Sequence, residues 1–463
     1  MSDYLNNGDT IIALSTPLGN GAIAVIRIGG PDALAVFNPF LKQPIREEDA
    51  RKAIFNEIVT QDKTTIDQVI TTWFRAPASY TGEDLLEISC HCNPLIIDSI
   101  IDLAISNGAR VAAPGEFTFR AFLNGKLNLA QAEAVSDLIN SRSRQSLTQS
   151  MRHLEGRLSE RISTIRERIL NLLSLLEVSL DFSEDEIELI PMPELINRIE
   201  TTIAEIQQFL RTYDYGRLLQ EGIKLLILGK PNVGKSSLLN ALLQRDRAIV
   251  SDIPGTTRDY IEANLELDGL AVQAVDTAGI RDTEDTVEAI GVERALNQLQ
   301  TADIALCVFD GNAPLSSDDT VLIDLISEHQ KDVSFILIAN KSDLLQNEQT
   351  IQTLEALTSP LCSLSAVTSS GIDTLKQDIK RSLISDVSLE SEEVVITSAR
   401  HKAALDKTIE SLVHSVQSIQ AGASEEIIAI DMRLALDHIG EITGETSSED
   451  VLNHIFSSFC IGK

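Results

Sequence analysis

A segment from Gly229 to Ser236 carries the residue types that a phosphate-binding loop requires. It reads Gly-Lys-Pro-Asn-Val-Gly-Lys-Ser, follows an apolar run and precedes a pattern typical of a helix. The glycines allow backbone N–H groups to point at a phosphate, Lys235 is expected to reach the β- and γ-phosphate oxygens, and Ser236 to coordinate Mg²⁺. The predicted nucleotide contacts in and after this segment are Asn232, Val233, Gly234, Lys235, Ser236 and Ser237.

Two segments further along the chain predict that the bound base is guanine. The run Asn340-Lys341-Ser342-Asp343 follows the apolar residues 335–339. A carboxylate at its end accepts hydrogen bonds from N1 and N2 of guanine, and adenine offers no such pair of donors. A backbone N–H of Ser365-Ala366 is expected to reach O6. The predicted base contacts are therefore Asn340, Lys341, Asp343, Ser365 and Ala366.

Residues 251–257 and 276–279 lie where two switch regions of such a site belong. The run Asp276-Thr277-Ala278-Gly279 follows an apolar stretch, so Asp276 can hold the Mg²⁺ shell through water and the Gly279 N–H can contact the γ-phosphate. The earlier loop is expected to supply a second Mg²⁺ ligand. Predicted GTP contacts in these regions are Ser251, Asp252, Ile253, Pro254, Gly255, Thr256, Thr257, Asp276, Thr277, Ala278 and Gly279.

These motifs do not identify the group that orients the attacking water. Ras-like GTPases carry a Gln directly after the Asp-x-x-Gly run, but this chain has Ile280, whose aliphatic side chain cannot orient water. Four carboxylates follow in the second switch, and residue chemistry alone leaves the choice among them open: Asp282, Glu284, Asp285 and Glu288.

The composition limits the surroundings in which such a site can work. The chain has 463 residues, with 38 Lys and Arg against 69 Asp and Glu and a formal net charge of −31. This charge predicts a soluble protein that bare nucleic acid and anionic membranes repel, so an RNA substrate requires a local basic patch or a partner. The five cysteines form no disulfide framework, and we find neither a signal peptide nor an apolar run that spans a bilayer. A cytoplasmic protein without membrane contact is expected.

The hydrophobic pattern predicts a multidomain protein of α/β and all-α parts. Residues 1–120 mix strand and helix patterns, residues 121–218 and 383–463 show helical periodicity, and residues 219–382 alternate apolar strands with amphipathic helices. The simplest organisation is an α/β N-terminal domain followed by one helical domain that is built from both helical stretches. A parallel-sheet nucleotide domain is inserted between those stretches.

From Asp9 to Lys463 the chain resembles the tRNA modification GTPase MnmE (TrmE) family of bacteria and organelles. The resemblance rests, outside the nucleotide motifs, on Ser79-Tyr80-Thr81-Gly82-Glu83-Asp84, on Pro114-Gly115-Glu116-Phe117-Thr118, on residues 120–127 and on the terminal residues 455–463. It implies a folate-binding-like α/β N-terminal domain that dimerises, a helical domain and an inserted Ras-like P-loop GTPase domain.

The resemblance also assigns roles within the GTPase domain. Thr257 would join Ser236 in coordinating Mg²⁺, and Glu288 would be the catalytic residue that positions water. A K⁺ ion would offset the charge that grows between the β- and γ-phosphates. Two such domains would meet face to face when K⁺ and GTP are bound. The implied K⁺ ligands are Asn232, Ser251, Ile253 and Thr256.

A one-carbon site in the N-terminal domain is a further implication of the resemblance. The residues that would bind 5-formyltetrahydrofolate, or a related tetrahydrofolate, are Arg27, Glu87, Lys126 and Lys463. Cys460 is a candidate active-site thiol, although its neighbours Phe459 and Ile461 predict partial burial, which disfavours a thiolate. His91-Cys92-Asn93 replaces the family's His-Gly-Gly, which puts side chains where glycines would allow a close backbone approach.

The function implied by the resemblance is a K⁺-activated GTPase that works as a homodimer. With the flavin-containing partner MnmG/GidA, in a heterotetramer or larger complex, it would modify C5 of the wobble uridine of certain tRNAs. GTP hydrolysis would drive dimerisation of the GTPase domains and a conformational change. One alternative is a ribosome-associated assembly GTPase without its own modification chemistry, which the nucleotide motifs permit equally. Another, an autonomous folate-dependent methyltransferase, would need a redox cofactor site, and no Gly-x-Gly-x-x-Gly follows a predicted strand.

Overall fold

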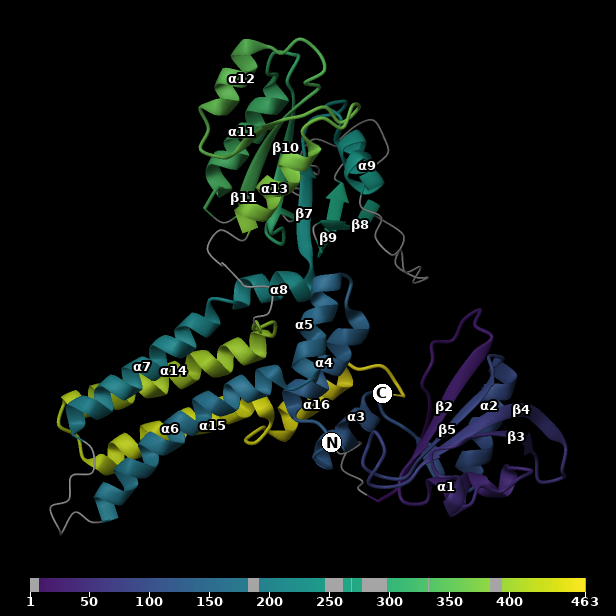
Figure 1. Ribbon diagram of the computed structural model, residues 1–463. Coiled ribbons are helices and arrows are strands. Elements are labelled where there is room, and N and C mark those ends of the chain that lie inside the picture. The colour runs from purple at the N-terminus through teal and green to yellow at the C-terminus, as the bar shows by residue number, and fades with distance from the viewer. Residues whose placement is uncertain are drawn as a thin grey trace. The chain divides into compact units, whose positions relative to one another are not determined.

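The computed structural model describes residues 8–181, 191–245, 261–267, 269–276, 298–331, 333–383 and 394–462 (Figure 1). The chain divides into two compact units. The first contains residues 1–136, 153–200 and 407–463, and the second contains residues 137–152 and 201–406. Among the described residues, no helix combines the length and the apolar character needed to cross a bilayer.

A six-stranded sheet forms the N-terminal part of the first unit, in the order β3-β4-β5-β2-β1-β6. Neighbouring strands are antiparallel except for β1 and β6. The strands are β1 (Thr10–Leu14), β2 (Ile23–Gly29), β3 (Ala53–Val59), β4 (Thr65–Phe74), β5 (Leu85–His91) and β6 (Ala109–Val111).

Alternation along β2 decides which side chains meet the core of this sheet. Ala24, Ile26 and Ile28 are buried against Ile97 and Ile100 of a covering helix. Because successive side chains point to opposite faces, the residues between them face the other side. The helices of this part are α1 (Ala33–Phe37), α2 (Pro94–Ser106) and α3 (Glu116–Leu123), with 3₁₀ turns at Asn38–Phe40 and Glu47–Asp49.

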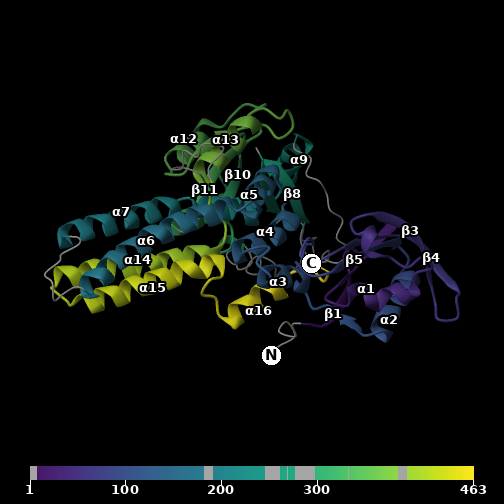
Figure 2. The same cartoon turned by 60° about the horizontal axis from the view of Figure 1, so that its bottom comes forward.

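Long helices follow the first sheet and return after the second. Helix α6 of the first helical stretch lies along α15 of the second (Figure 2). An ion pair at 2.6 Å joins Arg433 Nη2 to Glu177 Oε1 across this contact. The helices are α4 (Leu129–Asn140), α5 (Arg144–Leu154), α6 (Arg157–Asp181), α7 (Met192–Leu210), α8 (Tyr213–Glu221), α14 (Ala399–Gln420), α15 (Glu425–Thr443) and α16 (Glu449–Ser457).

A second six-stranded sheet, in the order β12-β11-β10-β7-β9-β8, is parallel except for the pair β8–β9. Apolar residues pack on both of its faces, as a parallel sheet requires. Its strands are β7 (Ile223–Leu228), β8 (Ile261–Leu267), β9 (Leu270–Asp276), β10 (Ile304–Asp310), β11 (Ser334–Asn340) and β12 (Leu361–Ser363). Its helices are α9 (Lys235–Arg245), α11 (Ser317–His329), α12 (Glu348–Glu355) and α13 (Ile372–Leu383).

Candidate functional site

The predicted phosphate-binding loop connects β7 to α9, at the carboxyl edge of the parallel sheet where ligands of such sheets bind. Two of its glycines have positive φ, +150° at Gly229 and +102° at Gly234. A Cβ atom at Gly229 would lie 2.5 Å from Val308 O, and one at Gly234 would lie 2.2 Å from Asn340 Nδ2. The loop therefore lies directly against β10 and β11, and both positions require glycine.

Lys235 is placed by the loop that it follows. Its side chain is buried, and Nζ donates to Gly229 O at 2.6 Å and to Lys230 O at 2.9 Å. Ser236 and Ser237 are exposed in the first turn of α9. An ammonium at the N-terminal end of a helix, where the helix dipole favours negative charge, makes a site suited to a phosphate anion.

Asn340 joins the phosphate loop to the predicted base pocket. Its side-chain Nδ2 donates to Val233 O at 2.7 Å, and its Oδ1 accepts from Ala366 N at 3.0 Å. Because Asn340 is only 3% exposed, these bonds are shielded from water. One side chain thus holds together three segments that the sequence predicts to contact one nucleotide.

The remaining base residues lie beside this link. The Ser342 N–H donates to Leu364 O at 3.1 Å, which brings the turn that carries the exposed Asp343 next to the segment of Ser365 and Ala366. Ser365 is fully buried, and its Oγ accepts from Thr368 N at 3.2 Å. A carboxylate and a backbone N–H therefore come from adjacent segments, as recognition of guanine requires.

Lys341 has an ion-pair partner that was not predicted from the sequence. Its Nζ lies 2.6 Å from Asp310 Oδ2, and its backbone adopts a φ of +67°. Asp310 ends β10 after an apolar run, just as Asn340 ends β11. The shared placement at the carboxyl ends of neighbouring parallel strands is the signal that could have identified it.

Several predicted residues lie outside the part of the chain that the structure describes. For Asp276 the backbone is described: it ends β9 and pairs with Ile227 of β7, two residues before Gly229. The others are Ser251, Asp252, Ile253, Pro254, Gly255, Thr256, Thr257, Thr277, Ala278, Gly279, Glu288 and Lys463.

The described oxygen donors fit the cations that the motifs imply. The hydroxyl of Ser236 is exposed beside Lys235, and the strand that ends at Asp276 neighbours the strand that leads into the phosphate loop. The hydroxyl oxygen of Ser236 suits Mg²⁺, which usually keeps several waters. Asn232 is exposed in the loop with a φ of +65°, and its amide oxygen suits a monovalent cation.

A second candidate site lies on the open face of the N-terminal sheet. Arg27 of β2 and Glu87 of β5 are register partners, and Arg27 Nε lies 2.8 Å from Glu87 Oε1. Arg27 Cζ lies 5.7 Å from the centroid of the Tyr80 ring. The Tyr80 hydroxyl is 2.9 Å from Thr118 Oγ1, and burial raises the pKa of this phenol. The structure thus brings two predicted residues together and adds an aromatic ring that the prediction missed.

Lys126 reaches the same loop that carries Tyr80. Its Nζ donates to Pro77 O at 3.0 Å, and Asn124 Nδ2 donates to Thr81 O at 2.8 Å. The segment that directly follows α3 is therefore hydrogen-bonded to residues 77–81. Lys126 and the Arg27–Glu87 pair consequently flank one loop.

The C-terminal tail also lies on the first unit. The Gly115 N–H donates to Cys460 O at 3.3 Å, and Ser15 Oγ donates to Gly462 O at 3.0 Å. Ser15 directly follows β1, the strand that pairs with the strand of Arg27. The expected partial burial of Cys460 is wrong: Cys460 is exposed, and Ile461 is 55% exposed. Phe459 alone among the three turns into the core, because the chain bends away after α16.

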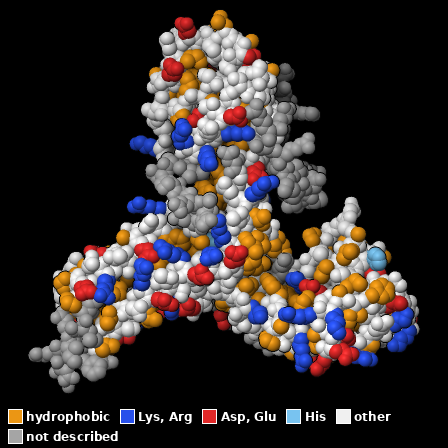
Figure 3. Space-filling view, viewed as in Figure 1, with side chains coloured by type: hydrophobic (Ala, Val, Ile, Leu, Met, Phe, Trp, Pro, Cys, Tyr) orange, Lys and Arg blue, Asp and Glu red, His pale blue; other side chains and the backbone are white. Residues whose placement is uncertain are grey.

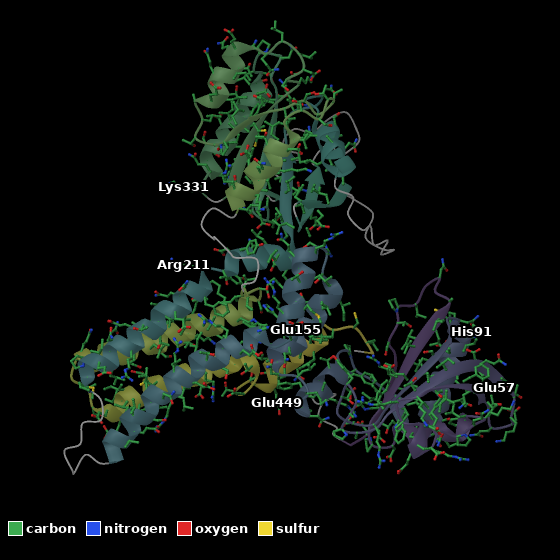
Figure 4. The ribbon with its side chains drawn as sticks, in the orientation of Figure 1. Glu57, His91, Glu155, Arg211, Lys331 and Glu449 are labelled. Atoms are coloured by element: carbon green, nitrogen blue, oxygen red, sulfur yellow. The ribbon has the colours of Figure 1, made fainter. Side chains whose placement is uncertain are left out.

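The His91-Cys92-Asn93 segment has a local structural role. His91, labelled in Figure 4, projects from the end of β5, and its Nδ1 lies 2.7 Å from Asp67 Oδ1. The Asn93 side chain accepts from Leu95 N at 2.9 Å and so caps α2. Cys90 is buried whereas His91 is exposed, so the two side chains lie on opposite faces of the strand. Asn is among the residues that cap helix starts best, so Asn93 contributes to where α2 begins.

Positively and negatively charged side chains are intermixed on the described part of the surface. Lys and Arg side chains are interspersed with Asp and Glu on the face drawn in Figure 3. Exposed cations of the N-terminal sheet have acidic neighbours, as in the pairs Lys42–Glu57 at 3.0 Å and Arg75–Glu47 at 3.2 Å. Local neutralisation of this kind weakens attraction to nucleic-acid phosphates.

The chain was compared with known proteins. A family model described as the MnmE helical domain matches residues 129–460, and one described as the GTP-binding protein TrmE N-terminus matches residues 10–126. Proteins named tRNA modification GTPase MnmE are similar over 98% of this chain and 99% of their own length. Those of Carboxydothermus hydrogenoformans and Moorella thermoacetica are 42% identical, and that of Natranaerobius thermophilus is 41% identical. The solved G domain of the Thermotoga maritima FeoB iron transporter covers 35% of this chain and 98% of its own, at 26% identity and a TM-score of 0.27.

Proposed function

Because the chain belongs to the tRNA modification GTPase MnmE family, we propose that its GTP hydrolysis serves modification of C5 of the wobble uridine in certain tRNAs. The protein hydrolyses GTP to GDP and phosphate, and the part of the chain that contains the second sheet carries the nucleotide motifs. Its GTPase activity serves tRNA modification. The wobble position, the one-carbon unit, the cations and the partners are the proposed parts.

The observation that carries this proposal is the position of the C-terminal tail. Ser15 Oγ holds Gly462 O at the end of β1, next to the strand of Arg27, and Gly115 N holds Cys460 O. A protein that only docked on ribosomal particles would not need a C-terminal tail that is fixed beside the sheet of the proposed folate site. The tail therefore favours modification chemistry over the assembly-factor alternative.

We propose that the open face of the N-terminal sheet binds 5-formyltetrahydrofolate or a related tetrahydrofolate, which supplies a one-carbon unit when bound. Arg27 and Lys126 suit its carboxylates or pterin carbonyl, and Glu87 suits the pterin amino and ring N–H donors. The Arg27–Glu87 pair is about three-quarters buried, which supports directed recognition rather than a solvated surface charge. Lys463 would complete the site, with Cys460 as the candidate thiol beside it.

In the proposed GTPase site, each described residue has one task. Asp343 recognises the guanine N–H groups, Lys235 donates to the phosphates, and Asn340 keeps the base pocket and phosphate loop in register. Ser236, Asp276 and Thr257 would hold Mg²⁺, which offsets phosphate charge when bound. The proposed K⁺ ligands are Asn232, Ser251, Ile253 and Thr256.

Glu288 is the proposed positioning group for the attacking water. Position 280 holds an aliphatic side chain, so the usual Gln is replaced by a residue elsewhere. A carboxylate can accept a hydrogen bond from the attacking water, either directly or through a second, bridging water. In the sequence, Glu288 follows the run from Asp276 to Gly279, within the segment that the motifs predict to be the second switch.

We further propose a homodimer that works with the flavin-containing partner MnmG/GidA. The net charge of −31 and the locally paired cations fit a division of labour in which the partner supplies most of the grip on tRNA. The flavin of that partner would supply redox chemistry.

The proposal is tested by mass spectrometry of wobble nucleosides from a strain that lacks this gene. Loss of the C5 modification, and its return on complementation with the wild-type chain but not with Arg27→Ala, is the expected result. Unchanged wobble nucleosides together with immature ribosomal particles would instead establish the assembly-factor function.

A further inference from the structure

Lys230 belongs to the phosphate-binding loop, but its side chain reaches the start of α11. Its Nζ lies 2.5 Å from Asp319 Oδ2 and 3.0 Å from Ser316 Oγ. Strands β8, β9 and β10 lie between the loop and α11 along the chain, and Lys230 and Asp319 are 89 residues apart. This ion pair is therefore a purely tertiary link between the loop and a helix.

Asp319 is a rigid anchor for that link. Its Oδ2 also accepts from Ser316 N and from Ser316 Oγ, both at 2.8 Å, in a capping box that starts α11. The carboxylate is 2% exposed, and Ile326 further along α11 packs into the core beneath the sheet. A buried, charge-assisted bond to a helix that is fixed by packing holds its partner firmly.

The backbone of Lys230 contacts the lysine that acts on the nucleotide. Lys230 O accepts from Lys235 Nζ at 2.9 Å, beside Gly229 O at 2.6 Å. A continuous series of contacts thus runs from α11 through Asp319 and Lys230 to the ammonium of Lys235. The far end of the loop is held separately, because Val233 O accepts from Asn340.

We propose that Lys230 is a positioning residue for GTP binding and hydrolysis, which acts by fixing the carbonyl oxygens that hold Lys235. The tether to Asp319 determines how far the Lys235 ammonium sits from the β- and γ-phosphate oxygens. Loss of the tether lets the first half of the loop move while Asn340 still holds the second half. GTP therefore loses more affinity than GDP, because Lys235 would contact both the β- and the γ-phosphate of GTP but only the β-phosphate of GDP.

The test compares variants of the full chain in Mg²⁺-containing buffer. Lys230→Met removes the tether and leaves Asp319 buried without its cation, which by itself lowers stability. The double variant Lys230→Met/Asp319→Asn also lacks the tether but leaves no unpaired charge, and Asn retains helix-capping ability. Lys230→Arg keeps the charge. Arg381→Met, which removes a 78% exposed cation paired at 3.6 Å with Asp378, is the matched control.

The measurements are the affinities for fluorescent GDP and for a fluorescent, non-hydrolysable GTP analogue, with thermal unfolding recorded in parallel. We expect the ratio of GTP to GDP affinity to fall about tenfold or more in both the single and the double variant, since small misplacements of a phosphate-binding group are costly. Lys230→Arg should restore most of the ratio, and Arg381→Met should leave it unchanged.

Three results would overturn the proposal. In the first, Lys230→Met leaves the affinity ratio at its wild-type value. In the second, both nucleotides lose affinity equally, so that the tether has no particular effect on the contact between Lys235 and the γ-phosphate. In the third, the double variant regains the wild-type ratio, and the single variant was then impaired merely by a buried unpaired charge.

Discussion

The side-chain amide of Asn340 donates to the carbonyl oxygen of Val233 at 2.7 Å, so the last residue of β11 holds the phosphate-binding loop. The same side chain accepts from Ala366 N at 3.0 Å. The predicted base pocket and the predicted phosphate-binding loop are therefore linked through one buried amide. A change at either contact should disturb both ends of the nucleotide site.

Gly234→Ala should greatly weaken GTP binding. A methyl group at Gly234 would lie 2.2 Å from Asn340 Nδ2, and φ is +102°. Overpacking of this kind costs about 1–3 kcal/mol, and the loop can relieve it only by moving away from Asn340. The affinity is measured by titration with fluorescent GTP. Gly422→Ala, where φ is +70° and no atom lies within 4 Å, controls for backbone strain and should bind GTP normally.

Asp343→Asn should shift the preference from guanine toward xanthine nucleotides. The substitution replaces an acceptor with a group that can donate to the extra carbonyl of xanthine. Competition between GTP and xanthosine triphosphate for the full chain measures the shift. Wild-type protein that bound ATP as tightly as GTP would contradict guanine recognition at this turn.

Replacement of Na⁺ by K⁺ at constant ionic strength should strongly raise GTP turnover, and Asn232→Ala should remove this response. The amide oxygen of Asn232 is exposed in the phosphate loop and is the described member of the proposed K⁺ ligands. A rate that does not depend on which cation is present would refute the potassium site. That outcome would not contradict GTP binding itself.

Arg27→Ala should weaken binding of 5-formyltetrahydrofolate about tenfold or more, because a charge-assisted contact is lost and Glu87 is left without its partner. Calorimetry on the full chain provides the measurement. Arg75→Ala removes an exposed cation from the same sheet and should bind the folate as the wild type does. If the wild type itself gave no heat and no competition, the one-carbon site would be absent.

Glu288→Ala should lower the rate at saturating GTP by at least about tenfold, as loss of a group that positions water typically does. GTP affinity should hardly change, because the side chain is proposed to contact water and not the nucleotide. Single-turnover hydrolysis separates the two effects. Glu284→Ala and Asp285→Ala are the matched controls, and a larger loss in either would identify a different acid. Modification that continued without hydrolysis would uncouple the switch from the chemistry.

The sequence predicted the parts of this protein that are local. Apolar runs preceded the phosphate-binding loop, the Asp276 run and the Asn340 run, and the strands β7, β9 and β11 occur where those runs lie. Such runs are short, continuous and bounded, so their pattern alone identifies buried parallel strands. The phosphate loop is equally local, because its spacing is dictated by the ligand. Its glycines are needed wherever that backbone path occurs.

The partial burial of Cys460 was predicted wrongly because the path of the tail depends on contacts between residues that are far apart in the sequence. Its apolar neighbours Phe459 and Ile461 indicate burial, but only Phe459 enters a core, and the tail continues across the surface toward β1. Ser15 and Gly462, which fix that path, are 447 residues apart. Neighbouring residue types carry no information about a contact of that kind.

The sequence by itself determined that the protein binds guanine nucleotide, because each of those motifs is a contiguous run whose residue types are set by the chemistry of GTP. The tertiary structure decided how side chains meet across the fold. It placed Arg27 against Glu87 and Tyr80, Lys341 against Asp310, and Lys230 against Asp319. Contacts between residues 31 to 89 positions apart depend on strand order and helix packing, and these have no local signature in the chain.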